Sequence, residues 1–139
     1  MKRYLALDIG AKRTGLALVN DESKVATPLM VISQEVKSAE FIHELLRQMN
    51  EYEIDILLVG LPIDLKGKEA IAATNIRNLA ASITARINKD IEIIFVDERL
   101  STAQAEKALK LADVSSKNRK NMRDAHAAMV IAQSYIDSL

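Results

Sequence analysis

Hydrophobic positions along the chain follow two different periods, and the change between them predicts the order of strands and helices. Short apolar runs that end at glycine, proline or acidic residues are typical of strands buried in a sheet. Such runs predict strands at residues 4–9, 14–19, 24–32, 54–59 and 91–96. Pro28 interrupts the third run, so we expect an edge or bulged strand there, because proline cannot donate a hydrogen bond to a sheet ladder.

Helical spacing replaces the strand pattern in the rest of the chain. After Ser38, a plausible N-cap, apolar residues recur every three or four positions. An alanine-rich segment with isoleucine and leucine at helical spacing follows the fourth strand. The predicted helices cover residues 39–49, 69–87, 101–111 and 124–136, and a polar, basic stretch at 114–122 predicts a loop.

This order of elements predicts an α/β fold. Three consecutive strands favour an antiparallel meander, and the two later strands, each separated from the previous one by a helix, favour parallel pairing. We therefore expect a mixed five-stranded sheet with helices on both faces. No internal repeat, low-complexity tract or linker divides the chain, so residues 1–139 are expected to form one domain.

Composition narrows the classes of function. Lys and Arg total 19 and Asp and Glu also total 19, so any surface for nucleic acid must be a local basic patch. The absence of cysteine excludes disulfides and thiolate metal sites. No apolar run reaches the roughly 18 residues of a membrane span, and no signal segment is recognisable, so we expect a cytoplasmic protein without membrane contact.

Acidic residues stand at the ends of two predicted strands and at the start of the last helix. Asp8 ends the first strand, Asp97 and Glu98 end the last strand, and Asp124 opens the last helix. Ligand sites in open α/β sheets gather at the carboxyl ends of the strands. Converging carboxylates repel one another and remain ionised together only around a cation. Oxygen ligands of this kind favour Mg²⁺ or Mn²⁺ over zinc.

Each acid also has a simpler structural interpretation when it is taken alone. Asp8 suits a turn, Asp124 suits the first turn of a helix, and residues 97–99 suit a surface ion pair. The histidines do not strengthen the metal hypothesis. His126 is two positions from Asp124 and so points elsewhere on the helix, and His43 is expected to be structural or solvent-facing.

Four segments together give the chain a resemblance to a known family. They read LALDIGAKRTGLAL at 5–18, LLVGLPIDLKGKE at 57–69, VDERLSTAQAEKAL at 96–109 and DAHAAMVIAQSYID at 124–137. In this order and spacing they resemble the YqgF-type family of RNase H-like nucleases. Its members are described as Holliday junction resolvases or as nucleases for the leader of the small-subunit ribosomal RNA precursor. The resemblance implies an RNase H-like fold and a metal-dependent hydrolase.

The resemblance also implies roles for individual residues. Asp8, Glu98 and Asp124 match the family's catalytic, metal-binding acids, which would hold two Mg²⁺ or Mn²⁺ ions. Asp97 stays an alternative to Glu98 as a ligand, because neighbouring strand residues point to opposite faces. Basic residues close to these acids are expected to bind nucleic acid phosphates; they are Lys12, Arg13, Arg99, Lys117, Arg119, Lys120 and Arg123.

The expected function is hydrolysis of phosphodiester bonds in 5′-end processing of the small-subunit (16S) ribosomal RNA precursor. The first alternative is a Holliday junction resolvase that acts on branched DNA, and a further one is a non-catalytic nucleic-acid-binding module on the same fold. An actin-like or sugar-kinase-like phosphotransferase is disfavoured, because the chain is too short for the second domain that closes over a nucleotide. Both a monomer and a homodimer remain open.

Overall fold

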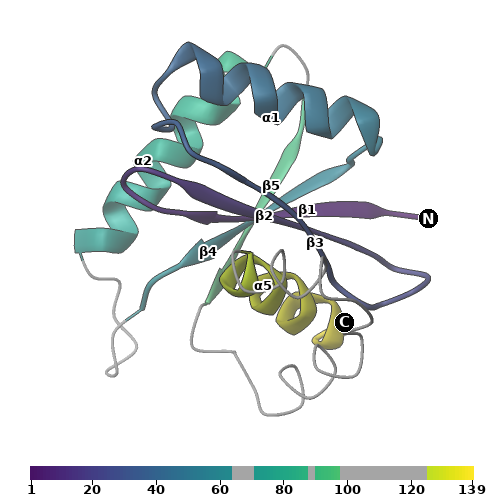
Figure 1. Ribbon diagram of the computed structural model, residues 1–139. Coiled ribbons are helices and arrows are strands. Elements are labelled where there is room, and N and C mark those ends of the chain that lie inside the picture. The colour runs from purple at the N-terminus through teal and green to yellow at the C-terminus, as the bar shows by residue number, and fades with distance from the viewer. Residues whose placement is uncertain (64–70, 88–89, 98–124) are drawn as a thin grey trace.

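The computed structural model describes residues 1–63, 71–87, 90–97 and 125–139, and within them the chain forms one mixed sheet between two layers of helices (Figure 1). Helices α1 and α2 cover one face of the sheet, and α5 covers the other. The strands are β1 (Arg3–Ile9), β2 (Thr14–Asn20), β3 (Thr27–Ile32), β4 (Ile56–Leu61) and β5 (Glu92–Asp97), and the helices are α1 (Ala39–Glu51), α2 (Ile71–Arg86) and α5 (His126–Asp137).

The sheet has the order β3-β2-β1-β4-β5, which places β1 at its centre. β1 pairs antiparallel with β2, and β2 pairs antiparallel with β3. β4 pairs parallel with β1, and β5 pairs parallel with β4. The expected fold class, an antiparallel meander extended by two parallel strands, is therefore confirmed.

The strand boundaries differ from the predicted ones where the backbone takes a left-handed conformation. Lys24 has φ 59°, so the run predicted from residue 24 enters a sheet only at Thr27. Glu53 has φ 50°, and β4 begins after it, at Ile56. β3 is an edge strand with a register shift opposite Leu16 and Ala17, which confirms the expectation based on Pro28. The predicted helix at 101–111 and loop at 114–122 lie outside the described residues.

Alternation along β1 divides the core into two halves. Leu5 and Leu7 face α1 and α2, whereas Tyr4 and Ala6 face α5. All six residues of β4 are buried, as expected for a strand covered on both faces. The Ser38 hydroxyl accepts a hydrogen bond from the backbone N–H of Phe41 at 3.1 Å, which confirms the predicted N-cap of α1.

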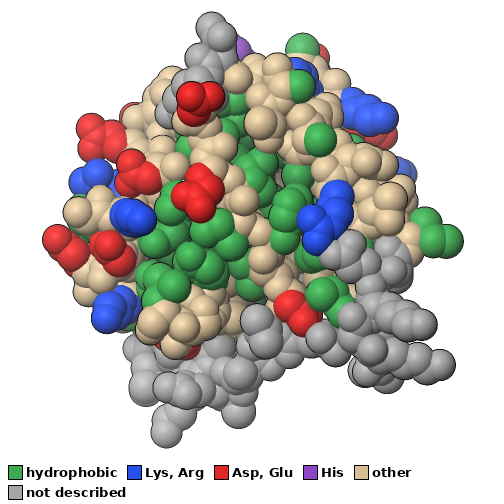
Figure 2. Space-filling view, turned by 180° about the vertical axis from the view of Figure 1, so that it is seen from behind, with side chains coloured by type: hydrophobic (Ala, Val, Ile, Leu, Met, Phe, Trp, Pro, Cys, Tyr) green, Lys and Arg blue, Asp and Glu red, His purple; other side chains and the backbone are tan. Residues whose placement is uncertain are grey.

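The β5 edge of the sheet carries half-buried apolar side chains. Ile93, Ile94 and Phe95 are each partly exposed on this edge strand. Viewed from behind, hydrophobic side chains gather in the middle of the molecule (Figure 2). The guanidinium of Arg77 on α2 lies 4.6 Å from the centre of the Phe95 ring, so a cation–π contact covers part of this edge.

Candidate active site

The candidate site lies at the edge of the sheet where the three parallel strands end. Asp8 is the second-to-last residue of β1, and Asp97 is the last residue of β5. Leu7 pairs with Val59 and Leu61 pairs with Asp97, so the ends of β1, β4 and β5 fall at the same edge. Sites in α/β sheets form at this edge, because strand ends and the loops that follow them meet there.

Asp8 is a partly buried carboxylate without a compensating group among the described residues. Burial raises the pKa of its carboxyl above the ordinary aspartate value, because a buried carboxylate loses hydration. No hydrogen bond or ion pair to its side chain offsets that cost within the described part of the chain. A cation beside this carboxylate would offset the cost of its burial.

A tight turn joins β1 to β2 directly beyond Asp8. The backbone N–H of Gly10 donates a hydrogen bond to the carbonyl oxygen of Arg13 at 2.9 Å. A Cβ atom at position 10 would lie 2.6 Å from that oxygen, so the turn requires glycine. Lys12 and Arg13 are both exposed on this turn, close in the chain to Asp8. Their position fits the expected contact with phosphate.

The two strand-end aspartates lie on opposite faces of the sheet. The side chain of Asp8 lies on the same face of β1 as those of Tyr4 and Ala6, which pack on the α5 side. The side chain of Asp97 lies on the same face of β5 as that of Phe95, which packs on the side of α1 and α2. The structure therefore separates Asp8 from Asp97 by the thickness of the sheet.

Helix α5 runs antiparallel to β1, so its first turn lies level with Asp8. The rings of Tyr4 and Tyr135 are 5.4 Å apart, which fixes the end of the helix beside the start of the strand (Figure 1). From Tyr4 to Asp8 the strand rises about 13 Å. From Tyr135 back to His126 the helix rises about 13.5 Å. The N-terminus of α5 is thus at the same edge as Asp8.

Several predicted site residues fall outside the residues that the structure describes. They are Glu98, Arg99, Lys117, Arg119, Lys120, Arg123 and Asp124. Within the described residues, no three acidic, histidine or cysteine side chains gather into a metal site. The carboxylate of Asp8 is nevertheless a hard oxygen ligand of the kind that Mg²⁺ and Mn²⁺ prefer.

A cleft of about 930 Å³ opens beside Asp8, between the strand ends and α2. Asp8, Gly10 and Ala11 line one side of it. The other side is formed mainly by α2, and the remaining lining residues are Ile9, Lys37, Pro62, Ala72, Asn75, Ile76, Asn78, Leu79 and Ser82. Sequence reasoning did not single out Lys37 or the polar residues of α2. For the polar residues of α2, the only signal in the sequence is that Asn75, Asn78 and Ser82 recur at helical spacing.

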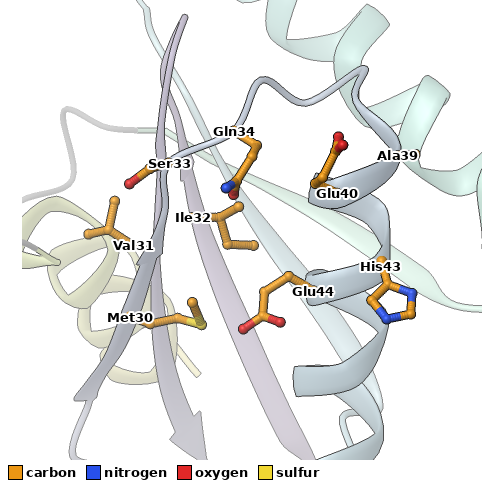
Figure 3. Close-up of a pocket in the computed structure, with 9 residues that line it drawn as sticks. All are labelled: Met30, Val31, Ile32, Ser33, Gln34, Ala39, Glu40, His43 and Glu44. Atoms are coloured by element: carbon orange, nitrogen blue, oxygen red, sulfur yellow. The ribbon is translucent and has the colours of Figure 1, made fainter.

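A second hollow of about 620 Å³ lies between β3 and α1 (Figure 3). Glu44 extends toward it from α1, and Glu40 and His43 on the same helix also line it. None of its described lining residues is Lys or Arg, so it is poorly suited to phosphate. His43 is exposed, as expected for a solvent-facing residue. We therefore assign the candidate site to the strand end at Asp8, where the cleft reaches β1 from the α2 side and the Asp8 side chain lies on the α5 side.

Comparison with known proteins identifies the family. The model of the RuvX family, described as "Holliday junction resolvase", matches residues 2–138. The chain belongs to the RuvX family. A "Putative pre-16S rRNA nuclease" of Sulfurihydrogenibium sp. (strain YO3AOP1) is 40% identical, over 100% of this chain and 92% of the relative. A relative of the same description from Dictyoglomus thermophilum is 37% identical, over 98% of this chain and 96% of its own length.

Solved structures of resolvases share the fold of this RuvX-family chain. The Fowlpox virus resolvase in complex with Holliday junction DNA has a TM-score of 0.57 at 13% identity, over 98% of this chain and 97% of that chain. Thermus thermophilus RuvC in complex with a Holliday junction substrate has a TM-score of 0.56 at 11% identity, over 99% of this chain and 95% of that chain. This likeness supports the RNase H-like fold expected from sequence. No helix among the described residues could cross a membrane.

Proposed function

We propose that this protein is a divalent-metal-dependent nuclease that processes the 5′ end of the small-subunit ribosomal RNA precursor in the cytoplasm. The observation that carries the proposal is the Asp8 carboxylate, partly buried and uncompensated among the described residues at the shared end of the parallel strands. Similarity along nearly the whole chain to relatives described as "Putative pre-16S rRNA nuclease" favours RNA as the substrate.

The residues proposed to hold the metal are Asp8, Glu98 and Asp124. Asp97 lies on the opposite face of the sheet from Asp8, which supports Glu98 over Asp97 as a ligand. The start of α5 lies level with Asp8, and Asp124 comes two residues before that helix in sequence, which supports Asp124. Two bound Mg²⁺ or Mn²⁺ ions would lower the pKa of a water molecule and neutralise charge on the scissile phosphate.

The chain's own basic residues would orient the substrate strand. Lys12 and Arg13 on the exposed turn after β1 are proposed to bind the phosphates that flank the scissile bond. The short Gly10 turn keeps them close to Asp8, because its hydrogen bond to Arg13 closes the hairpin directly beyond the strand end. Arg99, Lys117, Arg119, Lys120 and Arg123 are proposed to extend this phosphate-binding surface.

A Holliday junction resolvase is the second candidate function. The description of the matching family model and the resolvase structures with the same fold favour it. Resolving a junction needs two symmetric cuts, so this function also requires a homodimer with two sites. The oligomeric state measured by sedimentation therefore bears on the choice between the two functions.

A cleavage assay with two labelled substrates tests both functions. One substrate is an RNA that spans the 5′ leader junction of the small-subunit precursor, and the other is a four-way DNA junction. Each is incubated with Mg²⁺, Mn²⁺ or EDTA and with wild-type protein, Asp8→Asn or Asp55→Asn. Asp55 is the matched control, because it lies before β4 at the opposite edge of the sheet and accepts a hydrogen bond from Arg3 N–H that Asn can retain.

We expect metal-dependent cleavage that Asp8→Asn lowers at least about 100-fold, since loss of even an outer partner of a metal ligand costs roughly 10- to 100-fold. Asp55→Asn should cut like wild type. The substrate that is cut faster identifies the function. If neither is cut, while nucleic acid binding is the same in EDTA and in metal, the protein is a non-catalytic binding module.

A further inference from the structure

We propose that the cleft beside Asp8 binds one unpaired nucleotide of the substrate strand. Asn75 and Asn78 of α2 would contact the edge of its base, and Lys37 would contact a neighbouring phosphate. The inference rests on the proposed function in so far as the bound strand is taken to be the strand that is cut. It goes beyond that function by assigning a base-binding site to residues that the metal chemistry does not use.

The size and position of the cleft fit this role. Its volume of about 930 Å³ lies within the range of roughly 300–1,000 Å³ that is typical of sites for small organic ligands. Asp8, Gly10 and Ala11 line the same cleft. The cleft therefore reaches the end of β1 from the α2 side, and the Asp8 side chain lies on the α5 side of the same strand end. A strand with one nucleotide in the cleft would pass this strand end on its way to the proposed metal site.

The lining of the cleft suits a base better than a row of phosphates. Pro62, Ile76 and Leu79 give it apolar walls, while Asn75 and Asn78 contribute amides. Lys37 is the only Lys or Arg among its described lining residues, whereas binding several phosphates requires several cations. A nucleobase has apolar faces and an edge of donors and acceptors, and side-chain amides match such an edge with paired hydrogen bonds.

The two amides are available for binding. Asn75 and Asn78 are both exposed, and neither has a hydrogen-bond partner among the described residues. They stand three positions apart, so they lie on the same side of α2, while Ala73, Ala80 and Ile83 anchor that helix to the core. Each asparagine costs up to about 0.7 kcal/mol relative to alanine in a helix, so folding alone does not favour them.

The backbone on either side of Lys37 is held near α2 by long-range hydrogen bonds. The guanidinium of Arg86, in the last turn of α2, donates to the carbonyl oxygens of Ser38 and Val36. These two residues flank Lys37 in the chain, so Arg86 ties the segment that carries Lys37 to the helix that carries the amides. Lys37 therefore borders the cleft from a held backbone, and we treat Arg86 as its positioning residue.

This arrangement predicts a preference for unpaired strands. A base in a duplex is stacked, and its Watson–Crick edge is occupied by the partner base. Moving such a base into a cleft costs unstacking and unpairing energy of a few kcal/mol, whereas an unpaired base enters without that cost. We therefore expect the cleft to favour single-stranded or splayed positions next to the scissile bond.

Fluorescence anisotropy on the full chain tests the proposal. The probes are a short labelled single-stranded RNA and the same RNA annealed to its complement, and Asp8→Asn is the background so that no probe is cut. Asn75→Ala/Asn78→Ala removes both amides, and Asn50→Ala on α1 is the matched control, because Asn50 is exposed and does not line the cleft. For Lys37→Ala the control is Lys2→Ala, at the opposite end of β1.

We expect the double asparagine variant to weaken single-strand binding at least about 10-fold, in line with the contribution of base contacts, and to leave duplex binding unchanged. Lys37→Ala should weaken binding to RNA of any sequence. It should also lower, by about 1, the steepness with which the logarithm of the binding constant falls with the logarithm of salt concentration. Misfolding does not explain such losses, because alanine favours the helix and thermal melts of the variants can be compared. As a second variant, Asn78→Asp keeps the side-chain size but removes the amide donors, so it should weaken single-strand binding more than duplex binding.

The outcomes separate this inference from the proposed function. If wild-type protein cuts its substrate, but Asn75→Ala/Asn78→Ala and Asn78→Asp both bind single strands as the parent protein does, the base-binding inference is wrong and the nuclease proposal stands. If wild-type protein cuts nothing while the double variant loses single-strand binding, the binding site stands and the nuclease proposal fails. Equal losses for single strand and duplex would also overturn the inference, because the cleft would then contact only the backbone.

Discussion

Gln133 bridges α5 to the segment between β2 and β3, and its removal gives a sharp test of how the helix is held. The side chain is 2% exposed. Its Oε1 accepts a hydrogen bond from Ala26 N–H at 2.9 Å, and its Nε2 donates to the Lys24 carbonyl at 2.9 Å and to Asp137 Oδ1 at 3.0 Å. Gln133→Leu keeps a side chain of similar size but removes all three bonds.

The expected cost follows from which partners stay buried. Ala26 is 0% exposed, so its N–H is left without a partner at a cost of about 1–3 kcal/mol. Lys24 and Asp137 are exposed, so water replaces Gln133 as their partner at little cost. We therefore expect Gln133→Leu to lower the free energy of unfolding by about 2 kcal/mol. For a chain of this length, that lowers Tm by roughly 4–8 °C.

Urea titration and thermal melts followed by circular dichroism measure this change. Gln48→Leu is the matched control, because Gln48 is only half-buried. Its Nε2 donates a hydrogen bond to Glu44 Oε1, on the same helix, at 3.2 Å. It should change the free energy of unfolding by less than about 0.5 kcal/mol. If the two variants melt at the same temperature, the bridge does not contribute and apolar packing alone holds α5.

Three further predictions concern the strand-end site and its surroundings. Burial raises the pKa of the Asp8 carboxyl, so ionisation of Asp8 destabilises the fold as pH rises through that pKa. Asp8→Asn should therefore raise the Tm of the metal-free protein at neutral pH. The difference in Tm from wild type should vanish in thermal melts as pH falls toward the ordinary aspartate value of 3.8. Saturating Mg²⁺ or Mn²⁺, at about 100 times Kd, should stabilise wild type by about 2.7 kcal/mol in a thermal-shift assay and leave Asp8→Asn unaffected; an equal shift in both would exclude Asp8 as a ligand. Gly10→Ala should cost about 1–3 kcal/mol in denaturant titration, because its Cβ would lie 2.6 Å from the Arg13 carbonyl oxygen, and an unchanged midpoint would show that the turn relaxes freely.

Most of the fold could be predicted from the sequence, because strand and helix periods are local signals. The apolar run around β4, the Ser38 cap and the edge character of the Pro28 strand all follow from neighbouring residues. The left-handed conformations of Lys24 and Glu53 could not be predicted, because neither residue type signals a positive φ. The order of strands also escaped the pattern, since the side of the sheet on which β4 joins depends on tertiary packing.

Some residues of the candidate site could likewise be predicted from the sequence, and others could not. Asp8 at a strand end could be found, because the run ending there and the following glycine turn are contiguous in sequence. Lys37 could not be found, because its place at the cleft depends on Arg86, which contacts carbonyl oxygens 48 and 50 positions away. Asn75 and Asn78 form a recognisable face of α2, but only the structure brings that face to the cleft beside Asp8.

Asp8 links the stability of the fold to the proposed chemistry. It lies in β1, the central strand, where folding alone favours a neutral side chain. The burial that raises the pKa of its carboxyl also lowers the local dielectric, so a divalent cation at this position is attracted more strongly than at the surface. A neutral residue would fold better but would bind no metal. Under the proposed function, this position gives up stability for metal binding, and the opposite effects expected of Asp8→Asn without and with metal follow from this single cause.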